Sequence, residues 1–148
     1  MLRATKVRIY PTPEQAEFIN AQFGAVRFAY NKALHIKKHS YQRHRVNLNP
    51  RKDLKPLLAV AKKSRRYGWL KEYDSIALQQ VVINLDVAFS NFFNPKLKAG
   101  KPTFKSKHGR QSSYHCVGIK VLDAAIKIPK ILPIEARLHR EITGMLKS

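Results

Sequence analysis

Acidic side chains are scarce in this sequence of 148 residues, which has nine Asp and Glu residues against 29 Lys and Arg and a formal net charge of +20. Metal-dependent phosphodiester cleavage needs several carboxylates that converge on paired cations about 4 Å apart. The few carboxylates here are scattered, so we expect no catalytic residues and no metal site. A charge this one-sided favours a polyanionic partner, with nucleic acid ahead of an anionic membrane surface.

Cysteine and long apolar runs are also scarce. Cys116 is the only cysteine, which excludes an internal disulfide and a cysteine-based zinc cluster within the chain. A P-loop, a nucleophile elbow and a glycine-rich dinucleotide turn are missing. No apolar run approaches the roughly 20 residues of a membrane span, and the N-terminus lacks a signal-peptide core. We therefore expect an intracellular protein without a membrane partner, and its 44% hydrophobic content suffices for a core.

Residues 75–93 (SIALQQVVINLDVAFSNFF) contain no lysine or arginine and predict the central helix. Apolar residues recur at helical spacing on a broad face, Asp74 or Ser75 is placed to cap the N-terminus, and Pro95 favours an end at Asn94. The small polar face has two interpretations. It can read base edges through paired donors and acceptors, or it can simply be solvated, as most polar helix faces are. Its members are Gln79, Gln80, Asn84 and Asn91.

The N-terminal part predicts a strand followed by helices. Residues 1–10 alternate in a way typical of a short strand with one basic side. Thr12, Pro13 and Gln15 then form the start of a helix with a capping box. The apolar stripe continues past Gly24, where we expect a bend between two helices, and a basic extension over residues 37–45 includes Tyr41. A second short helix is predicted at residues 53–61.

The C-terminal part differs from the rest of the chain in composition and in predicted secondary structure. Residues 96–110 are rich in Lys and Gly and predict a loop that reaches phosphates. Short strands are predicted at residues 112–117, 119–122, 125–129 and 134–139, with the opening of another strand or hairpin at residues 143–144, so that the chain ends within a sheet.

Two further features, earlier in the chain, each have two interpretations. His35 and His39 are spaced for a metal or form a solvated basic face, which we favour, and Trp69 anchors the core or stacks on a base.

Several motifs together resemble the N-terminal part of the TnpB/OrfB proteins, which insertion sequences encode and which are associated with transposition and DNA recombination. The resemblance runs in order from residue 3 to about residue 140. Its motifs are residues 8–15 (RIYPTPEQ), 23–31 (FGAVRFAYN), 69–70 (WL), 78–80 (LQQ), 100–105 (GKPTFK), 128–130 (IPK) and 138–140 (LHR), with further matches at Leu85, Ala88, Phe89, Phe92 and Phe93.

The resemblance implies an α+β fold and an RNA-guided DNA endonuclease related to the type V CRISPR effectors. Residues 1–10 and 96–148 would belong to a partial oligonucleotide-binding β-barrel, the wedge domain, and residues 11–95 to a helix-turn-helix-like recognition insert. The family's RuvC-like nuclease domain, with its divalent metal such as Mg²⁺, and its zinc ribbon are not in these 148 residues. The resemblance therefore implies a truncated, decayed or split gene product, without a cofactor of its own, and a separately encoded C-terminal nuclease half is one implied partner.

Together, these arguments predict a fragment that binds nucleic acid, namely a transposon-derived guide RNA and target DNA, in the prokaryotic cytoplasm near the nucleoid. The resemblance places target-motif contacts at Ser75, Ile76 and Gln79. Thr103 and the short stretch at residues 114–118 depart from the family pattern and weaken such contacts from that loop. A free-standing helix-turn-helix DNA-binding regulator, with its turn at Gly24, is the alternative. The predicted nucleic-acid-binding residues are Arg8, Tyr10, Arg27, Lys37, Lys38, Tyr41, Ser75, Ile76, Gln79, Lys101, Phe104, Lys105, Lys107 and Arg140.

Overall fold

The fold is described from a computed structural model that covers residues 2–109, 112–138 and 144–148. The chain forms two compact units. One contains Met1–Ala21 with Cys116–Ser148, and the other contains Gln22–His115. Helix α1 (Pro13–His44) contributes residues to both, and each unit is described by itself.

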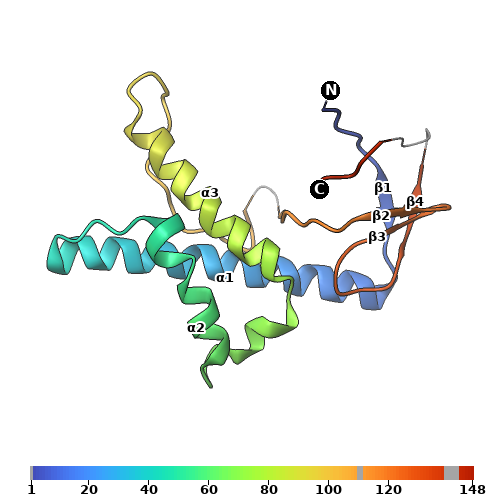
Figure 1. The fold of residues 1–148 in the computed structure, drawn as a ribbon, viewed down its shortest axis with the longest axis horizontal. Helices are drawn as coiled ribbons and strands as arrows, with labels where there is room; N and C mark the ends of the chain where they lie inside the picture. Colours follow the sequence, from blue (N-terminus) through green and yellow to red (C-terminus); the bar gives the residue numbers. More distant parts are fainter. Residues whose placement is uncertain (1, 110–111, 139–143) are drawn as a thin grey trace. The chain divides into compact units, whose positions relative to one another are not determined.

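Helix α1 begins where the sequence predicts. The Thr12 amide donates to Gln15 Oε1 (2.9 Å), and the Gln15 amide donates to Thr12 Oγ1 (3.2 Å), which confirms the reciprocal capping box. The predicted bend at Gly24 is wrong, because α1 is continuous from Pro13 to His44 (Figure 1). A glycine inside a helix costs only about 1 kcal/mol relative to alanine, and the buried alanines that follow it at Ala25 and Ala29 outweigh that cost.

Helix α3 (Ser75–Phe93) is the predicted central helix, with the predicted bounds. Asp74 caps it, since its Oδ1 accepts from the Ile76 amide (3.4 Å), and Asn94 ends it ahead of Pro95. Its apolar face joins the core of the second unit through Ala77, Leu78, Val81, Val82, Leu85 and Phe89, and α1 supplies Ala25, Val26, Ala29, Tyr30, Ala33 and Leu34.

Helix α3 is also, among the described residues, the one helix long and apolar enough to cross a membrane by length and composition. The expectation that no apolar run comes near this length was therefore wrong. A core helix can meet the same criterion, and six residues of α3 are buried in the core of the second unit.

The segment between α1 and α3 folds differently from the prediction of one helix at residues 53–61. A π-helical turn, η1 (Pro50–Leu54), precedes α2 (Leu57–Lys63) and the 3₁₀ helix η2 (Gly68–Glu72). Asn49 caps η1 through its Oδ1, which accepts from the Lys52 amide (3.0 Å). Pro56 lacks an amide proton, and it stands between η1 and α2, so the two helical pieces stay separate.

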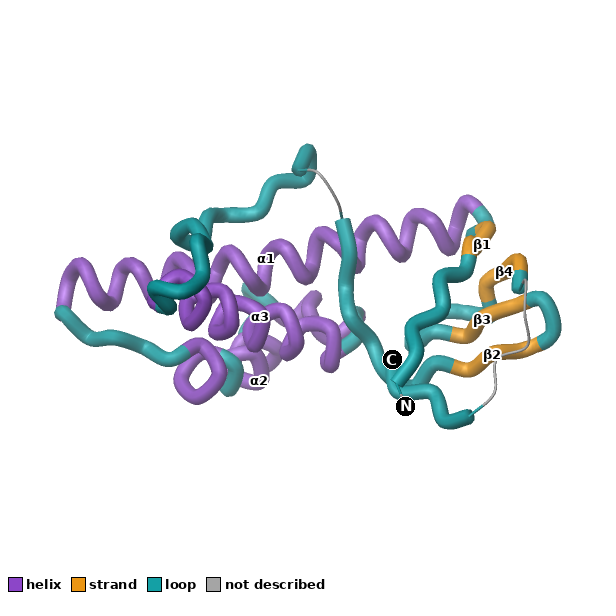
Figure 2. Tube along the Cα trace, turned by 90° about the horizontal axis from the view of Figure 1, so that it is seen from above, coloured by secondary structure: helices purple, strands orange, loops and turns teal. Residues whose placement is uncertain are grey.

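The first unit contains an antiparallel sheet of four short strands in the order β1-β4-β3-β2 (Figure 2). The strands are β1 (Arg8–Tyr10), β2 (Lys120–Leu122), β3 (Ala125–Lys127) and β4 (Ile134–Arg137). They confirm the predicted strands within narrower bounds. Ile134 and Ala136 of β4 are buried and alternate with exposed residues. The sheet formed by these described strands is open.

One predicted strand is wrong, since residues 112–117 have no regular structure. Their side chains contact α1, as described below, so the segment lies against a helix and has no neighbouring strand to pair with. The predicted hairpin at residues 143–144 falls partly outside the described residues.

Candidate nucleic-acid interface

Within the second unit, the segment after α3 folds back along α1 in the opposite direction. As the residue numbers increase along the segment, the residue numbers of their contact partners on α1 decrease. The pairs are Lys38 with Phe104 (Nζ to ring centroid 4.9 Å), Asn31 with Lys105, Arg27 with Ser112 (Nη1 to Oγ 3.3 Å) and Phe23 with Tyr114 (ring centroids 5.6 Å). Two of these four contacts, at Phe104 and Lys105, hold the lysine-rich loop against α1, and the other two hold Ser112 and Tyr114 just beyond the loop.

Asn31 forms the most specific of these contacts. Its Nδ2 donates to the Lys105 carbonyl oxygen (2.9 Å), and its Oδ1 accepts from the Lys105 amide (2.8 Å). A primary amide matches a peptide unit in this way because each offers one donor and one acceptor. The main chain of the loop is thus fixed at Lys105, and the lysines on either side of it are presented from a defined point.

The Lys105 ammonium group lies over the Tyr30 ring, with Nζ 4.5 Å from the centroid. Partial burial lowers the pKa of Lys105, and burial raises the pKa of Tyr30. A cation over an aromatic face is stabilised by the ring's quadrupole. The contact keeps the Lys105 side chain ordered along α1.

Four predicted residues, Arg27, Lys38, Phe104 and Lys105, are brought together in this way. Lys101 and Lys107 are exposed in the same loop. We call these six residues the α1–loop surface. The Phe104 side chain is 51% exposed despite its contact with Lys38, so part of an aromatic ring is offered to solvent beside a cation. Such a combination can hold phosphates and stack on a base.

Lys37 is placed differently from the neighbouring Lys38. It is only 9% exposed, and its Nζ donates to Asn47 Oδ1 (2.7 Å) and to the Leu48 carbonyl oxygen (2.6 Å). The ammonium group also lies 4.7 Å from the centroid of Phe89. Burial lowers the pKa of Lys37, and the charges of Asp86 and Asp53 partly oppose that shift. In this arrangement its ammonium group faces internal partners.

The start of α3 carries a second group of predicted residues, Ser75, Ile76 and Gln79. Gln79 and Ile76 are exposed, and Ser75 is half-buried. Beneath them, the Asp74 amide donates to Gln22 Oε1 (3.1 Å), which ties α3 to α1 at a buried point. Farther along the polar face, Gln80 Nε2 donates to Asn84 Oδ1 (3.0 Å), so part of that face is satisfied locally.

The remaining predicted residues are spread out. Arg8 and Tyr10 are exposed on β1, and Arg140 lies outside the described residues. Tyr41 is exposed near the end of α1 under the Arg45 guanidinium. Trp69 contacts the rings of Phe28 and Tyr73. These ring contacts support the interpretation that Trp69 anchors the core.

His35 and His39 stack with their ring centroids 5.9 Å apart. No group of three potential metal ligands occurs in the part of the chain that the structure describes.

Sequence reasoning did not place Asn31 or Tyr30 in the interface. Both belong to the motif at residues 23–31, so the signal was present in the sequence. Their role depends on which distant segment α1 meets, and the spacing of residues along a helix does not contain that information.

The fold and the charge describe a basic α+β protein, and comparison with known proteins shows what it is similar to. Residues 1–45 match the helix-turn-helix domain model of the OrfB family. The chain is 77% identical over 116 residues to "Virulence protein VsdF" of Salmonella dublin, a match that covers 74% of this chain and 98% of that protein.

Two longer relatives are each named as a "Putative RNA-guided DNA endonuclease". The protein from Streptomyces pristinaespiralis is 36% identical over 113 residues, covering 75% of this chain and 27% of the relative. InsQ of Escherichia coli (strain K12) is 28% identical over 149 residues, covering 99% of this chain and 36% of the relative. The chain belongs to the TnpB/OrfB family, and it spans about a third of the length of these two relatives.

Proposed function

We propose that this chain is a nucleic-acid-binding fragment of the TnpB type that holds a transposon-derived guide RNA and target DNA and has no catalytic centre of its own. The family match and the two endonuclease relatives support the nucleic-acid-binding part. The net charge of +20 supports a polyanionic ligand.

The observation that carries the proposal is the α1–loop surface. Arg27 and Lys38 project from α1, and the loop that carries Lys105 is fixed to the same helix by the two Asn31 hydrogen bonds. Cations that are ordered before binding lose less conformational freedom on contact with a phosphate backbone. In the proposed complex the cations bind phosphates, Phe104 stacks on a base, and Gln79 contacts a base edge near the start of α3.

The remaining parts of the proposal concern the partners. The open sheet of β1, β4, β3 and β2 would be part of an oligonucleotide-binding barrel, completed by further strands. Cleavage would require a separate nuclease half that brings Mg²⁺ and a zinc ribbon. We propose that both metals belong to that half, and the lack of a cluster of three His, Cys, Asp or Glu side chains among the described residues supports this. We place the complex in the cytoplasm, at the nucleoid.

The alternative, a free-standing helix-turn-helix regulator with its turn at Gly24, loses its geometric basis because α1 is continuous there. Such a regulator would protect two half-sites about one helical turn apart on duplex DNA. A single asymmetric footprint is expected here.

The first experiment is to purify the chain from its host without nuclease treatment and to sequence the RNA that accompanies it. A discrete RNA that maps to a transposon end is the expected result. Heterogeneous RNA that is lost in high salt would overturn guide recognition and leave only a non-specific polycation.

The second experiment measures the salt dependence of RNA binding. Replacing Lys101, Lys105 and Lys107 by Gln should flatten the slope of log K against log salt by up to roughly 0.9 for each lost phosphate contact on duplex, and less on single strands. The matched control replaces three exposed lysines elsewhere in the second unit, Lys52, Lys63 and Lys71. Equal slopes for the two triple variants would contradict the α1–loop surface as the binding site.

A further inference from the structure

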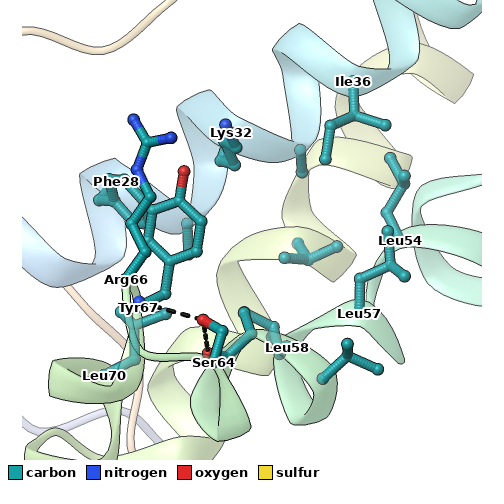
Figure 3. Close-up of a pocket in the computed structure, with 15 residues that line it drawn as sticks. Phe28, Lys32, Ile36, Leu54, Leu57, Leu58, Ser64, Arg66, Tyr67 and Leu70 are labelled. Atoms are coloured by element: carbon teal, nitrogen blue, oxygen red, sulfur yellow. Dashed lines mark hydrogen bonds between the residues drawn. The ribbon is translucent and has the colours of Figure 1, made fainter.

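A pocket of about 320 Å³ opens between α1 and the η1–α2 segment in the second unit (Figure 3). Its size falls at the lower end of the roughly 300–1,000 Å³ range of ligand-binding clefts. Buried Leu54, Leu70 and Val82 contribute to its lining. Leu57 and Val60 of α2 also line it, yet they are 42% and 64% exposed. Apolar side chains that line a pocket and remain exposed are typical of a docking surface.

The lining offers almost no polar atom to a ligand. All but four of its 15 residues are apolar, the four being Lys32, Ser64, Arg66 and Tyr67. The Ser64 hydroxyl already donates to the Ala61 carbonyl oxygen (2.7 Å) and accepts from the Tyr67 amide (3.1 Å). An extruded base would leave its hydrogen-bonding edge unsatisfied there, which is costly. The groups inserted into the apolar part of the pocket must therefore be apolar.

The two ends of the pocket differ in charge. Lys32 Nζ and the Arg66 guanidinium each lie 5.4 Å from the centroid of the Tyr67 ring. Figure 3 shows these three residues together at one end of the pocket, while Ile36, Leu54 and Leu57 lie at the other end. A ligand that fits has an anionic end and an apolar end.

The pocket is elongated along α1, which lines it from Phe28 through Lys32 to Ile36. The eight residue steps from Phe28 to Ile36 span about 12 Å. Apolar anchors at positions i, i+4 and i+7 of a partner helix span about 10 Å, which matches this length. The groove therefore suits two turns of a helix.

We propose that this pocket docks an amphipathic helix of a protein partner, with acidic residues over Lys32 and Arg66 and apolar anchors against Ile36, Leu54 and Leu57. Charge complementarity supports this occupant, because both cations stand at one end of an apolar groove in a chain of net charge +20. The pocket shares none of its lining residues with the six residues of the α1–loop surface, and the proposal does not depend on nucleic-acid binding.

The test uses a labelled synthetic helix of roughly 18 residues, with leucines at i, i+4 and i+7 and a pair of glutamates at one end. A second peptide of identical composition carries the glutamates at the other end. Binding is followed by fluorescence anisotropy and by the emission of Trp69, whose ring is 5.1 Å from that of the pocket residue Phe28. One orientation should bind at least about tenfold more tightly than the other.

The matched variants are Val60→Glu in the pocket and Val87→Glu on α3, which is 46% exposed and does not line the pocket. Val60→Glu should weaken binding about tenfold and Val87→Glu less than about twofold, although both change the net charge equally. A double variant, Lys32→Gln with Arg66→Gln, should abolish the preference between the two peptides. All three change exposed side chains, and circular dichroism checks their folding.

Three results would overturn the proposal. The two peptides could bind equally, which would indicate non-specific attraction of an anion to a basic protein. Both glutamate variants could weaken binding equally. A single-stranded oligonucleotide could displace the peptide from the native chain and yet have no effect on peptide binding to the Val60→Glu variant. That result would assign the groove to nucleic acid.

Discussion

The Asn31 side chain pairs with the main chain of Lys105 through two hydrogen bonds, of 2.9 and 2.8 Å, across 74 residues of sequence. The pair fixes the basic loop to α1 at its centre. Each such bond contributes about 0.5–1.5 kcal/mol to stability, and less where water competes, as at this exposed site. The larger consequence is that Lys105 starts from a defined geometry, while Lys101 and Lys107 flank a fixed point of the main chain.

We therefore expect Asn31→Ala to reduce RNA affinity about three- to tenfold while leaving most of the salt slope intact, because the cations remain but lose their preorganisation. Hydrogen exchange at the Lys105 amide should accelerate, since its acceptor is removed. Asn84→Ala is the control, as it removes an exposed amide on α3 that pairs only locally with Gln80. Unchanged protection at Lys105 would contradict the assigned role of Asn31.

The lowered pKa of Lys105 makes binding sensitive to alkaline pH. Burial over Tyr30 disfavours the ammonium form, so Lys105 loses its proton at a lower pH than an exposed lysine with its ordinary value of 10.5. As pH rises towards 10.5, the phosphate contact of Lys105 should be lost before the other lysine contacts, and affinity should fall. In the Lys105→Gln variant, the part of the affinity loss that begins at the lowest pH should be missing. Its affinity at neutral pH should be lower than that of the native chain.

The same shift has a defined effect on stability. Because the folded pKa lies below the unfolded one, the penalty for burying the charge is fully present at neutral pH and is relieved as pH rises through the folded pKa. The unfolding free energy of the native chain relative to Lys105→Gln should therefore rise in the window just below 10.5. Urea denaturation at several pH values measures it, and a difference that stays constant would count against the shift.

Lys37 and Lys38 are adjacent in sequence and should behave differently when changed. Lys37→Met removes bonds to Asn47 and to the Leu48 carbonyl oxygen, so we expect a loss of about 1–3 kcal/mol in stability. Its salt slope for RNA binding should equal that of the native chain. Lys38→Met should leave stability nearly unchanged and flatten the slope by up to about 0.9. Equal slopes for the two variants would mean that Lys37 turns outward on binding.

Local signals in the sequence predicted local structure well. The Thr12–Gln15 capping box, the Asp74 cap and the bounds of α3 are confirmed because each depends on residues within one helical turn. The strand proposed at residues 112–117 failed for the opposite reason. Its alternation fits a strand, but its contacts with Arg27 and Phe23 come from a helix that is about 85 residues away in the sequence.

The candidate site shows the same difference between local signals and contacts that join distant segments. Sequence alone predicted that Arg27, Lys38, Phe104 and Lys105 bind nucleic acid, from residue type and from family resemblance, and that stays a prediction. It could not separate Lys37 from Lys38, because the difference lies in which side chain meets Asn47 after the chain turns back. Periodicity predicts which face of a helix is buried, and it does not specify which segment covers it.

Gly24 offers a direct test of whether α1 is one helix. A Cβ at this position would meet Arg27 Nη2 at 3.7 Å, an ordinary van der Waals contact, and the backbone there has no positive φ. Gly24→Ala should therefore raise the free energy of unfolding by about 0.5–1 kcal/mol, since alanine favours a helix interior.

Gly118→Ala is the contrasting variant. Gly118 has φ +75°, in the left-handed region where a Cβ is disfavoured, so this change should destabilise the chain by about 1–2 kcal/mol. Urea denaturation followed by circular dichroism measures both variants. If Gly24 were the turn of a helix-turn-helix, with a conformation that alanine resists, Gly24→Ala would lower stability as Gly118→Ala does. A gain at Gly24 together with a loss at Gly118 would establish that the basic surface is built on a single unbroken helix.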